Sequence, residues 1–380
     1  MFGSTFAEPN DHSVLVIGAG VTGLTTAWCL RREGFAVTVV AEKFAPNIVS
    51  VVAGALWEWP PAVCGAHHDE VSLTRSKEWC MTSYEVFDEL SRRPGTGVFL
   101  RPVIFYFKSS VCERPRDLAK MNELKDKVKD FIHDAGLIEE NHVNPAAGVK
   151  DAYGHSAPMI DTDTYLGWLM SQVIRAGCTV VQGRIAGSLR DRERHLRRLF
   201  GADCIINCTG LGAMDLTEDD MYPLRGALIR VRNDGRAMPR ITKAHCMAHD
   251  PASREQDMIF IVPRGRNMLL LGGMTEPDEW SLDIGFDNYS PISEMLQRCR
   301  EFLPSLAHAQ VDEDEPVRVG LRPFRHRNVR LEWEPGSRII HNYGHGGSGV
   351  TLSWGCAQEV VELAKQLVSE DETEIQRASA

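Results

Sequence analysis

The chain has 380 residues, of which 43% are hydrophobic and 25% charged, so it can bury a large core as two domains or as one elaborated α/β domain. Its formal net charge of -10 favours neither a phosphate backbone nor an anionic lipid surface, and we expect no nucleic-acid partner. No apolar run reaches the roughly 18 residues of a membrane span, and the N-terminus lacks a basic segment followed by an apolar one, so we expect no membrane insertion and no secretion.

The chain begins with the pattern of a strand, a helix and a second strand. Val14 to Ile17 is a continuous apolar run, which is typical of a strand buried on both faces of a parallel sheet. Apolar residues recur at helical spacing from Val21 to Arg32, and Ala36 to Val40 has the composition of a strand. We therefore predict a βαβ unit at the N-terminus.

The turn between the first strand and the helix holds Gly18, Gly20 and Gly23. A pyrophosphate must approach such a turn closely and a Cβ would block it, so the spacing indicates dinucleotide binding, although glycines also occur in turns for packing alone. Glu42 follows the second strand, near where a ribose-binding carboxylate belongs. Its charge would repel a 2′-phosphate, which disfavours NADP.

Two groups of residues after this unit need separate interpretation. The tryptophans Trp57 and Trp59 fit a packed core and the wall of a flavin or substrate site equally well. His67 and His68 stand near a cysteine and a glutamate, but adjacent histidines point in different directions and no second cluster has ligand spacing. We predict no metal site.

The middle of the chain predicts helices and strands in mixed order. Helices are expected over residues 71–92, 116–135, 165–175 and 291–302, and strands over 98–107, 179–182, 203–207, 227–231, 258–262 and 268–271. The charged residues of the 116–135 helix are expected to face solvent. A tight turn is predicted after the strand at 203–207, and the β-rich stretch from 225 to 275 suggests a sheet on the substrate side.

A second glycine-rich segment lies near the C-terminus, where five glycines fall between Ile340 and Gly355 at the start of an apolar helical stretch, 350–367. Glycines allow backbone N–H groups to approach a flat or anionic ligand. With the N-terminal turn, this segment suggests one large cofactor bound by both ends of the chain. His341 and His345 lie in the segment, and a structural role is favoured over a general-base role for either.

The sequence resembles the D-amino-acid oxidase family, which includes D-aspartate oxidase. The resemblance is carried by the segments VLVIGAGVTGLTTA, AEKFAPNIVSVVAGALW, INCTGLGA, YPLRGALIRV, GLRPFRHRNVRLE and HNYGHGGSGVTLSWGCAQE, in the family's order. It implies an α/β fold with a discontinuous Rossmann-like FAD-binding domain, residues 11–60, 160–215 and 315–369. A β-rich α+β substrate domain would comprise residues 61–159 and 216–314.

The resemblance also implies which residues bind FAD. Ala19, Gly20, Val21 and Thr22 would contact the pyrophosphate, with Gly18 and Gly23 completing the turn. Glu42 would bind the adenosine ribose, where the family usually has aspartate, and Lys43 would lie near the adenine. The remaining implied contacts are a phosphate-binding segment, Ile48, Val49 and Ser50, an isoalloxazine wall, Gly54, Ala55 and Leu56, and a pyrimidine-edge segment, Gly346, Gly347, Ser348, Gly349, Val350 and Thr351.

Two of these expectations depend on residue type. Ile48 and Val49 replace part of a threonine run that is frequent in the family, so they offer only backbone contacts, whereas Ser50 keeps a hydroxyl. No cysteine falls at a recognisable covalent attachment position, so the resemblance implies FAD bound non-covalently.

Four residues are implied at the substrate. Arg322 would form a forked pair with the substrate carboxylate, and the Gly347 carbonyl would accept from the substrate amine. Gln256 and Phe260 stand where D-amino-acid oxidases carry two tyrosines that help to bind the carboxylate. Both hydroxyls are missing, which leaves the identity of the substrate open.

The implied activity is FAD-dependent oxidation of a D-α-amino acid or related amine, with hydride transfer from the α-carbon and reduction of oxygen to hydrogen peroxide. The alternatives are a tailoring oxidase or dehydrogenase of a secondary amine or imino acid, and a flavin-binding scaffold without turnover. The expected partners are the small-molecule substrate and molecular oxygen, and the oligomeric state is left open, with a homodimer as one option. Ten cysteines without a C-x-x-C pair fit a reducing compartment, so we expect the cytoplasm.

Overall fold

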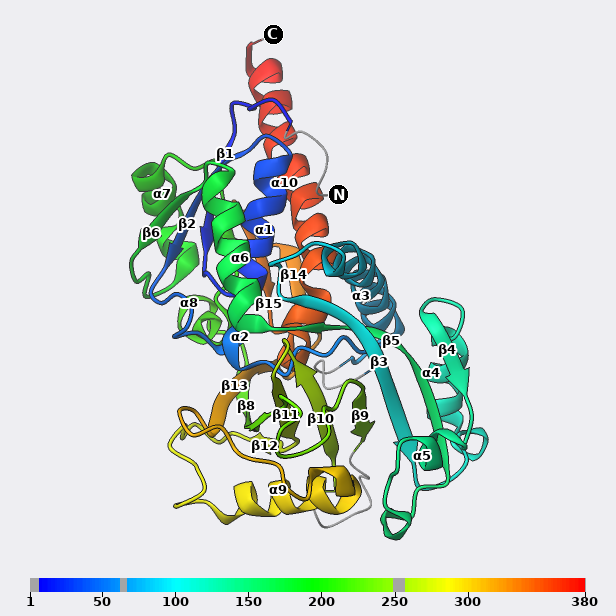
Figure 1. The fold of residues 1–380 in the computed structure, drawn as a ribbon. Helices are drawn as coiled ribbons and strands as arrows, with labels where there is room; N and C mark the ends of the chain where they lie inside the picture. Colours follow the sequence, from blue (N-terminus) through cyan, green and yellow to red (C-terminus); the bar gives the residue numbers. More distant parts are fainter. Residues whose placement is uncertain (1–6, 62–66, 249–256, 380) are drawn as a thin grey trace.

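The computed structural model describes residues 7–61, 67–248 and 257–379, with residues 370–379 as helical backbone only. Within these ranges the strands form one sheet of six and one of nine. The six-stranded sheet lies in the upper half of Figure 1 and most of the nine-stranded sheet below it. This arrangement is a mixed α/β fold, as predicted.

The six-stranded sheet has the order β14-β15-β7-β1-β2-β6. Its strands are β1 (Ser13–Ile17), β2 (Ala36–Ala41), β6 (Thr179–Gln182), β7 (Cys204–Asn207), β14 (Arg330–Trp333) and β15 (Ile339–Tyr343). All neighbours pair in parallel except β14, which runs antiparallel to β15 at one edge. The chain passes from β1 to β2 on one side and returns to β7 on the other, which makes β1 the point where the strand order reverses.

Helices cover both faces of this sheet. Val14 and Val16 face a core shared with α1 (Val21–Arg32), α6 (Thr162–Arg175) and α10 (Gly349–Ser379). The alternate residues Leu15 and Ile17 face α7 (Leu189–Phe200) and α8 (Ala213–Thr217). Burial on both sides is why β1 is apolar at successive positions rather than at every second one.

The nine-stranded sheet is mainly antiparallel and has the order β12-β8-β11-β10-β9-β3-β5-β4, with β13 also paired to β8. Its strands are β3 (Val98–Phe107), β4 (Lys129–His133), β5 (Asp151–Ile160), β8 (Met221–Arg232), β9 (Ala244–Met247), β10 (Ile259–Arg264), β11 (Met268–Gly272), β12 (Glu276–Pro277) and β13 (Val317–Arg325). Helix α9 (Ser290–Phe302) packs against it, and the other helices are α2 (Val49–Val52), α3 (Glu70–Ser91), α4 (Pro115–Leu124) and α5 (Leu137–Glu140).

The predicted elements are present, with one substantial error. The helix predicted over 116–135 ends at Leu124, and residues 129–133 form β4, which pairs with β5. Met121 and Leu124 are buried on the helical part, whereas Phe131 packs as a strand residue against the core. The helical spacing of the apolar residues continues through this segment, so pairing with β5 decides the conformation.

The six-stranded sheet draws on residues 13–41, 179–207 and 330–343, segments that are distant in the sequence. Strand β13, which the predicted FAD-binding domain includes, pairs along its whole length with β8 of the other sheet. The division into two domains therefore stays a prediction, with β13 joining the two parts.

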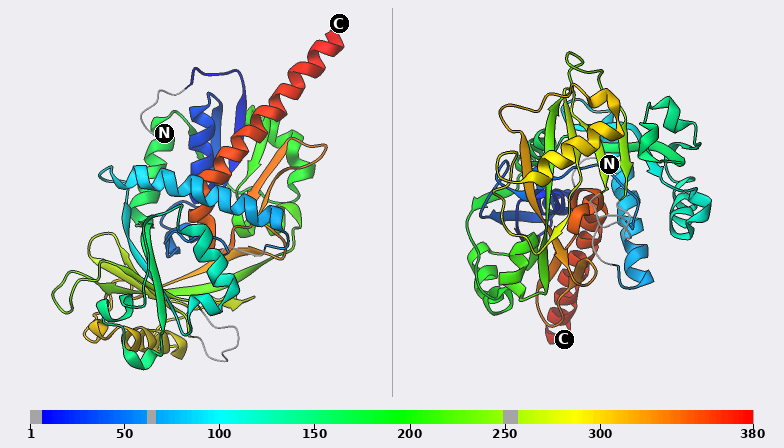
Figure 2. Two further views of the ribbon diagram at one scale, coloured as in Figure 1. Left: turned by 90° about the vertical axis from the view of Figure 1, so that its right-hand side faces the viewer. Right: turned by 90° about the horizontal axis from the view of Figure 1, so that it is seen from below.

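Helix α3 crosses α10, as the left view of Figure 2 shows. A Cβ at Gly355 would overlap the backbone of Trp79, and the Ser83 hydroxyl accepts hydrogen bonds from the N–H groups of Trp354 and Gly355. We expect Gly355→Ala to lower the free energy of unfolding by at least the 1–3 kcal/mol typical of overpacking, because backbone atoms cannot rotate away.

Thermal and denaturant unfolding would measure this loss. The matched control is Gly167→Ala in α6, where a Cβ has no neighbour within 4 Å. That change should be neutral or stabilise the protein by up to about 1 kcal/mol through helix propensity. Equal stability of the Gly355→Ala variant and wild type would show that the helices do not cross as closely as described.

Candidate functional site

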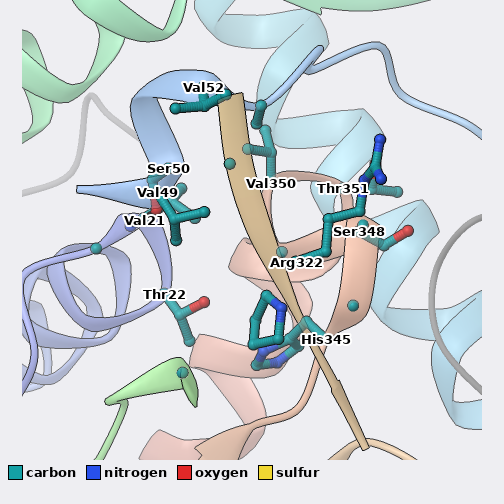
Figure 3. Close-up of a pocket in the computed structure, with 18 of the residues that line it drawn as sticks. Val21, Thr22, Val49, Ser50, Val52, Arg322, His345, Ser348, Val350 and Thr351 are labelled. Atoms are coloured by element: carbon teal, nitrogen blue, oxygen red, sulfur yellow. Dashed lines mark hydrogen bonds between the residues drawn. The ribbon is translucent and has the colours of Figure 1, made fainter. Parts of the chain in front are cut away.

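A cavity of about 1090 Å³ opens at the carboxyl ends of β1, β2 and β7 and is bordered by residues of both sheets. In parallel sheets this edge, at the point where the strand order reverses, is where ligands bind. Its lining comes from the N-terminal turn, the segment around α2, the turn after β7, the nine-stranded sheet and the segment before α10. Figure 3 shows several of these residues around one space.

The three glycines of the N-terminal turn have different roles. A Cβ at Gly18, whose φ is +111°, would press on the Cys208 carbonyl, and one at Gly23 would overlap the Gly18 carbonyl. These two therefore allow the turn to pack, and Gly23 does not line the cavity. Gly20 does line it, and its Cβ would meet only the Ser50 hydroxyl, at 3.1 Å. Gly20 is the position that keeps the backbone accessible to a ligand.

The N-terminus of α1 faces the cavity through Ala19, Val21 and Thr22. The Val21 N–H donates to the Ser50 hydroxyl at 3.0 Å, which joins the turn to α2, and Figure 3 shows these residues side by side. The first turn of α1 contains no acidic residue. The first N–H groups of a helix have no partner within the helix, and together with the helix dipole they favour an anion here.

Glu42 and Lys43 line the cavity at the end of β2. The Glu42 side chain is 58% exposed and lies 3.9 Å from Nε of Arg184, and its carbonyl accepts from Gln182. The carboxylate is thus accessible to a ligand at the edge between β2 and β6.

The segment around α2 forms another wall of the cavity, which includes the predicted residues Ile48, Val49, Ser50, Gly54, Ala55 and Leu56. Behind it, the buried Arg264 donates to the carbonyls of Val51 and Ala53, and Thr162 donates to the Val51 carbonyl at 2.6 Å. These bonds fix the backbone of the wall.

The C-terminal glycine segment supplies the facing wall with Gly346, Gly347, Ser348, Gly349, Val350 and Thr351. A short 3₁₀ turn leads from β15 into α10, whose first turn has no acidic residue. His345 is 4% exposed, its Nε2 has no hydrogen-bond partner within the described residues, and burial lowers the pKa of its imidazole to about 4. The imidazole is therefore neutral at neutral pH. It adds no charge of its own to the dipole at the N-terminus of α10.

Arg322 projects from β13 into the same cavity. Its Nη1 donates to the carbonyls of Arg225 at 3.4 Å and Met274 at 3.3 Å, and Gly226 leaves the space in which the guanidinium lies. Burial lowers the pKa of Arg322 to about 10, so it stays charged at neutral pH. No carboxylate of the described residues forms an ion pair with it. A buried cation in a cavity is a strong site for a carboxylate ligand.

Phe260, on β10, also lines the cavity, and the tip of its ring lies against Gly54, where a Cβ would be 2.6 Å from Cζ. The phenyl ring thus packs on the wall around α2. Gln256 lies outside the described residues.

One wall of the cavity carries charges that were not predicted from the sequence. Glu58, Arg116, Asp117 and Lys120 line the cavity, although the charges of α4 were expected to face solvent. That expectation is wrong for Lys120, whose side chain is 14% exposed and pairs with Glu58 at 2.8 Å. The spacing of apolar residues along the helix could not predict the burial of Lys120, because its partner Glu58 lies 62 residues away in the sequence.

The turn after β7 was predicted as a turn but not as part of the site. Cys208, Thr209, Gly210 and Gly212 line the cavity because β7 runs parallel to β1 and ends at the same edge. In the sequence, a buried strand that ends in a glycine-containing turn could have indicated that this turn borders the site.

Trp57 and Trp59 are 0% and 2% exposed and belong to the core, with the Trp57 indole donating to the Cys80 carbonyl. No group of three metal-binding side chains occurs among the described residues, His67 and His68 included. None of the described helices is both long and apolar enough to cross a membrane.

Comparison with known proteins gives consistent matches. Residues 13–363 match the family model described as FAD dependent oxidoreductase. The chain is 34% identical to a D-amino-acid oxidase of Rubrobacter xylanophilus over 93% of this chain and 96% of that protein, and 34% identical to one of Streptomyces coelicolor over 94% and 98%.

The fold is similar to those of several solved enzyme structures. Glycine oxidase from Geobacillus kaustophilus has a TM-score of 0.72 at 17% identity, with 93% of this chain and 95% of that chain covered. L-proline dehydrogenase from P. horikoshii has a TM-score of 0.70 at 14% identity, with 94% of each chain covered. At this level of identity the similarity describes the fold alone.

Proposed function

Because the chain belongs to the FAD-dependent oxidoreductase family, we propose that it is an oxidase of D-α-amino acids or related amines. Bound FAD would supply the two-electron acceptor for the α-hydrogen, so that the amine becomes an imine, water then gives the oxo acid and ammonia, and oxygen takes up the electrons as hydrogen peroxide. The protein's own part is to bind and orient the substrate in a closed site.

The cavity has the features that FAD requires. The open backbone at Gly20 and the N-terminus of α1 suit a pyrophosphate, and the accessible Glu42 carboxylate suits a ribose. The N-terminus of α10 faces the same cavity and would stabilise negative charge on the far end of the cofactor.

Non-covalent binding of FAD is supported by the two cysteines among the lining residues. Burial raises the pKa of the Cys208 thiol to about 12, and it also raises the pKa of Cys246. A thiol rather than a thiolate is a poor nucleophile, so neither residue is suited to form a bond to the flavin.

The observation that carries the proposal is the charged guanidinium of Arg322 in the cavity, without a carboxylate partner in the described parts of the chain. A substrate α-carboxylate would provide that partner through a forked pair. The Gly347 backbone lines the same space, and its carbonyl would accept from the substrate amine. These two anchors would fix the α-carbon between them, and the neutral His345 adds no competing charge.

The preference for D-enantiomers rests on the two bacterial relatives, each described as a D-amino-acid oxidase. The second candidate is an oxidase or dehydrogenase of a secondary amine or imino acid. It is favoured by the phenyl ring of Phe260, which offers no hydroxyl to a substrate carboxylate.

Aerobic turnover tests the proposal. The FAD-loaded protein would be incubated with enantiomer pairs of several α-amino acids and with secondary amines, while oxygen, hydrogen peroxide and ammonia are measured. The expected result is peroxide and ammonia in equal amounts from D-enantiomers only. Turnover confined to secondary amines would favour the second candidate, and flavin reduction without oxygen consumption would indicate a dehydrogenase.

A further inference from the structure

One wall of the cavity carries charges that the proposed reaction does not use. Glu58 follows the α2 segment, Lys120 lies on α4, and Nζ of Lys120 is 2.8 Å from Oε1 of Glu58. Besides burial, the Glu58 carboxylate raises the pKa of the Cys246 thiol on β9, and Lys120 opposes it. The pair therefore lies where the cavity is lined by the nine-stranded sheet.

Glu58 and Lys120 differ in how much of their hydrogen-bonding capacity remains for a ligand. Lys120 also donates to the Pro61 carbonyl at 3.1 Å and lies over the ring of Phe105, at 6.0 Å from its centre. Its side chain is 14% exposed, against 32% for Glu58. A carboxylate can accept about four hydrogen bonds, whereas an ammonium group has three to give. The wall also holds Arg116 and Asp117, whose formal charges cancel, and within the Glu58–Lys120 pair the more accessible group is the carboxylate of Glu58, which Lys120 holds in place.

This wall lies some distance from Arg322. Arg322 is on β13, and strands β8, β11 and β10 separate β13 from β9 in the sheet. Four strand steps would span roughly 19 Å between the backbones in a flat sheet. The twist of the sheet and the lengths of the two side chains shorten the gap that is left between the guanidinium and the carboxylate. A substrate that is anchored by its α-carboxylate at Arg322 reaches Glu58 only with a long side chain.

We propose that Glu58, positioned by Lys120, selects D-α-amino acids whose long side chain ends in a cationic ammonium or guanidinium group. The inference rests on the proposed function and deepens it. A cationic end group pairs with the carboxylate through charge-assisted hydrogen bonds. An acidic side chain is repelled there, and an apolar one removes water from the ion pair without replacing its hydrogen bonds.

The test compares D-lysine with D-norleucine, which lacks only the ammonium group, as reductants of the bound flavin without oxygen. The readout is the ratio of the second-order rate constants of flavin reduction for the two amino acids. Wild type should favour D-lysine, and Glu58→Gln, which keeps the length and the acceptor oxygen, should lower the ratio at least tenfold. The flavin spectrum and thermal stability of the variant report whether the site is intact.

Two controls test whether the effect is specific to the Glu58 carboxylate and to the ammonium group of the substrate. Glu123→Gln removes a carboxylate that pairs with Lys77 and does not line the cavity, so the ratio should stay at the wild-type value. On the substrate side, Nε-acetyl-D-lysine should reduce the wild-type flavin at least tenfold more slowly than D-lysine, without any change to the protein.

The inference is overturned by equal rates with D-lysine and D-norleucine in wild type, by an unchanged ratio in Glu58→Gln, or by a preference for D-glutamate. Reduction by D-norleucine with no gain from the ammonium group would leave the proposed function standing and remove only the role of Glu58. Failure of every D-amino acid to reduce the flavin would overturn both.

Discussion

Gly20→Val should yield a folded protein without bound FAD. A Cβ at this position meets only the Ser50 hydroxyl, at 3.1 Å, so the chain can accommodate it with a small shift. The two methyl groups of valine would extend into the cavity beside the N-terminus of α1. They would occupy the space through which a pyrophosphate approaches the backbone. We therefore expect the loss of essentially all bound flavin.

Flavin content per polypeptide after purification, and FAD titration of the apoprotein, measure this effect. Gly285→Val serves as a control, because Gly285 has only the Asn288 amide oxygen near its Cβ position, at 3.8 Å, and does not line the cavity. The control should retain its flavin. Wild-type flavin content in Gly20→Val would mean that the pyrophosphate does not lie on this turn.

Arg322→Lys should weaken substrate binding at least tenfold while flavin content stays unchanged. Arginine presents two parallel N–H donors to a carboxylate, and lysine presents a single point charge. Each charge-assisted hydrogen bond is worth about 1.5–3 kcal/mol, and a tenfold change in affinity corresponds to about 1.4 kcal/mol. Loss of one bond is therefore enough for the expected effect, and the hydrogen bonds from Nη1 to the carbonyls of Arg225 and Met274 would be lost as well.

The dependence of the flavin reduction rate on substrate concentration gives the affinity directly. Arg232→Lys is the control, since Arg232, on β8, pairs with the exposed Glu313 and does not line the cavity. It should change the apparent affinity little. An Arg322→Lys enzyme with wild-type kinetics would place the substrate carboxylate elsewhere, or show that the substrate has none.

The sequence predicted the parts of the site that follow directly from local pattern. Gly20, Glu42 and the segment from Gly346 to Thr351 all line one cavity, because a strand–turn–helix pattern determines which edge of a sheet its turn occupies. Local pattern also gave the extent of α1, α3 and α6 within a few residues. The family resemblance added Arg322. From its position in the sequence alone, this residue could not be distinguished from a surface arginine.

The parts that were not predicted depend on long-range pairing. Residues 129–133 keep a helical spacing of apolar side chains, and only the partner strand β5 makes them a strand. Glu58 and Lys120 are 62 positions apart, so their ion pair cannot be predicted from local sequence. Each residue alone has the pattern of a charged residue that faces solvent. Gly23 differs, because its contact is local: its packing role follows from the carbonyl of Gly18, which lies beside it in the same turn.

The most direct test of the account is anaerobic mixing of the FAD-loaded protein with the D- and L-enantiomers of the same α-amino acid, followed by the visible absorbance of the flavin. The proposed function predicts complete reduction by the D-enantiomer at a rate that saturates with concentration, and no reduction by the L-enantiomer. A flavin that stays oxidised with every D-α-amino acid of a panel of apolar, acidic and basic side chains would contradict it.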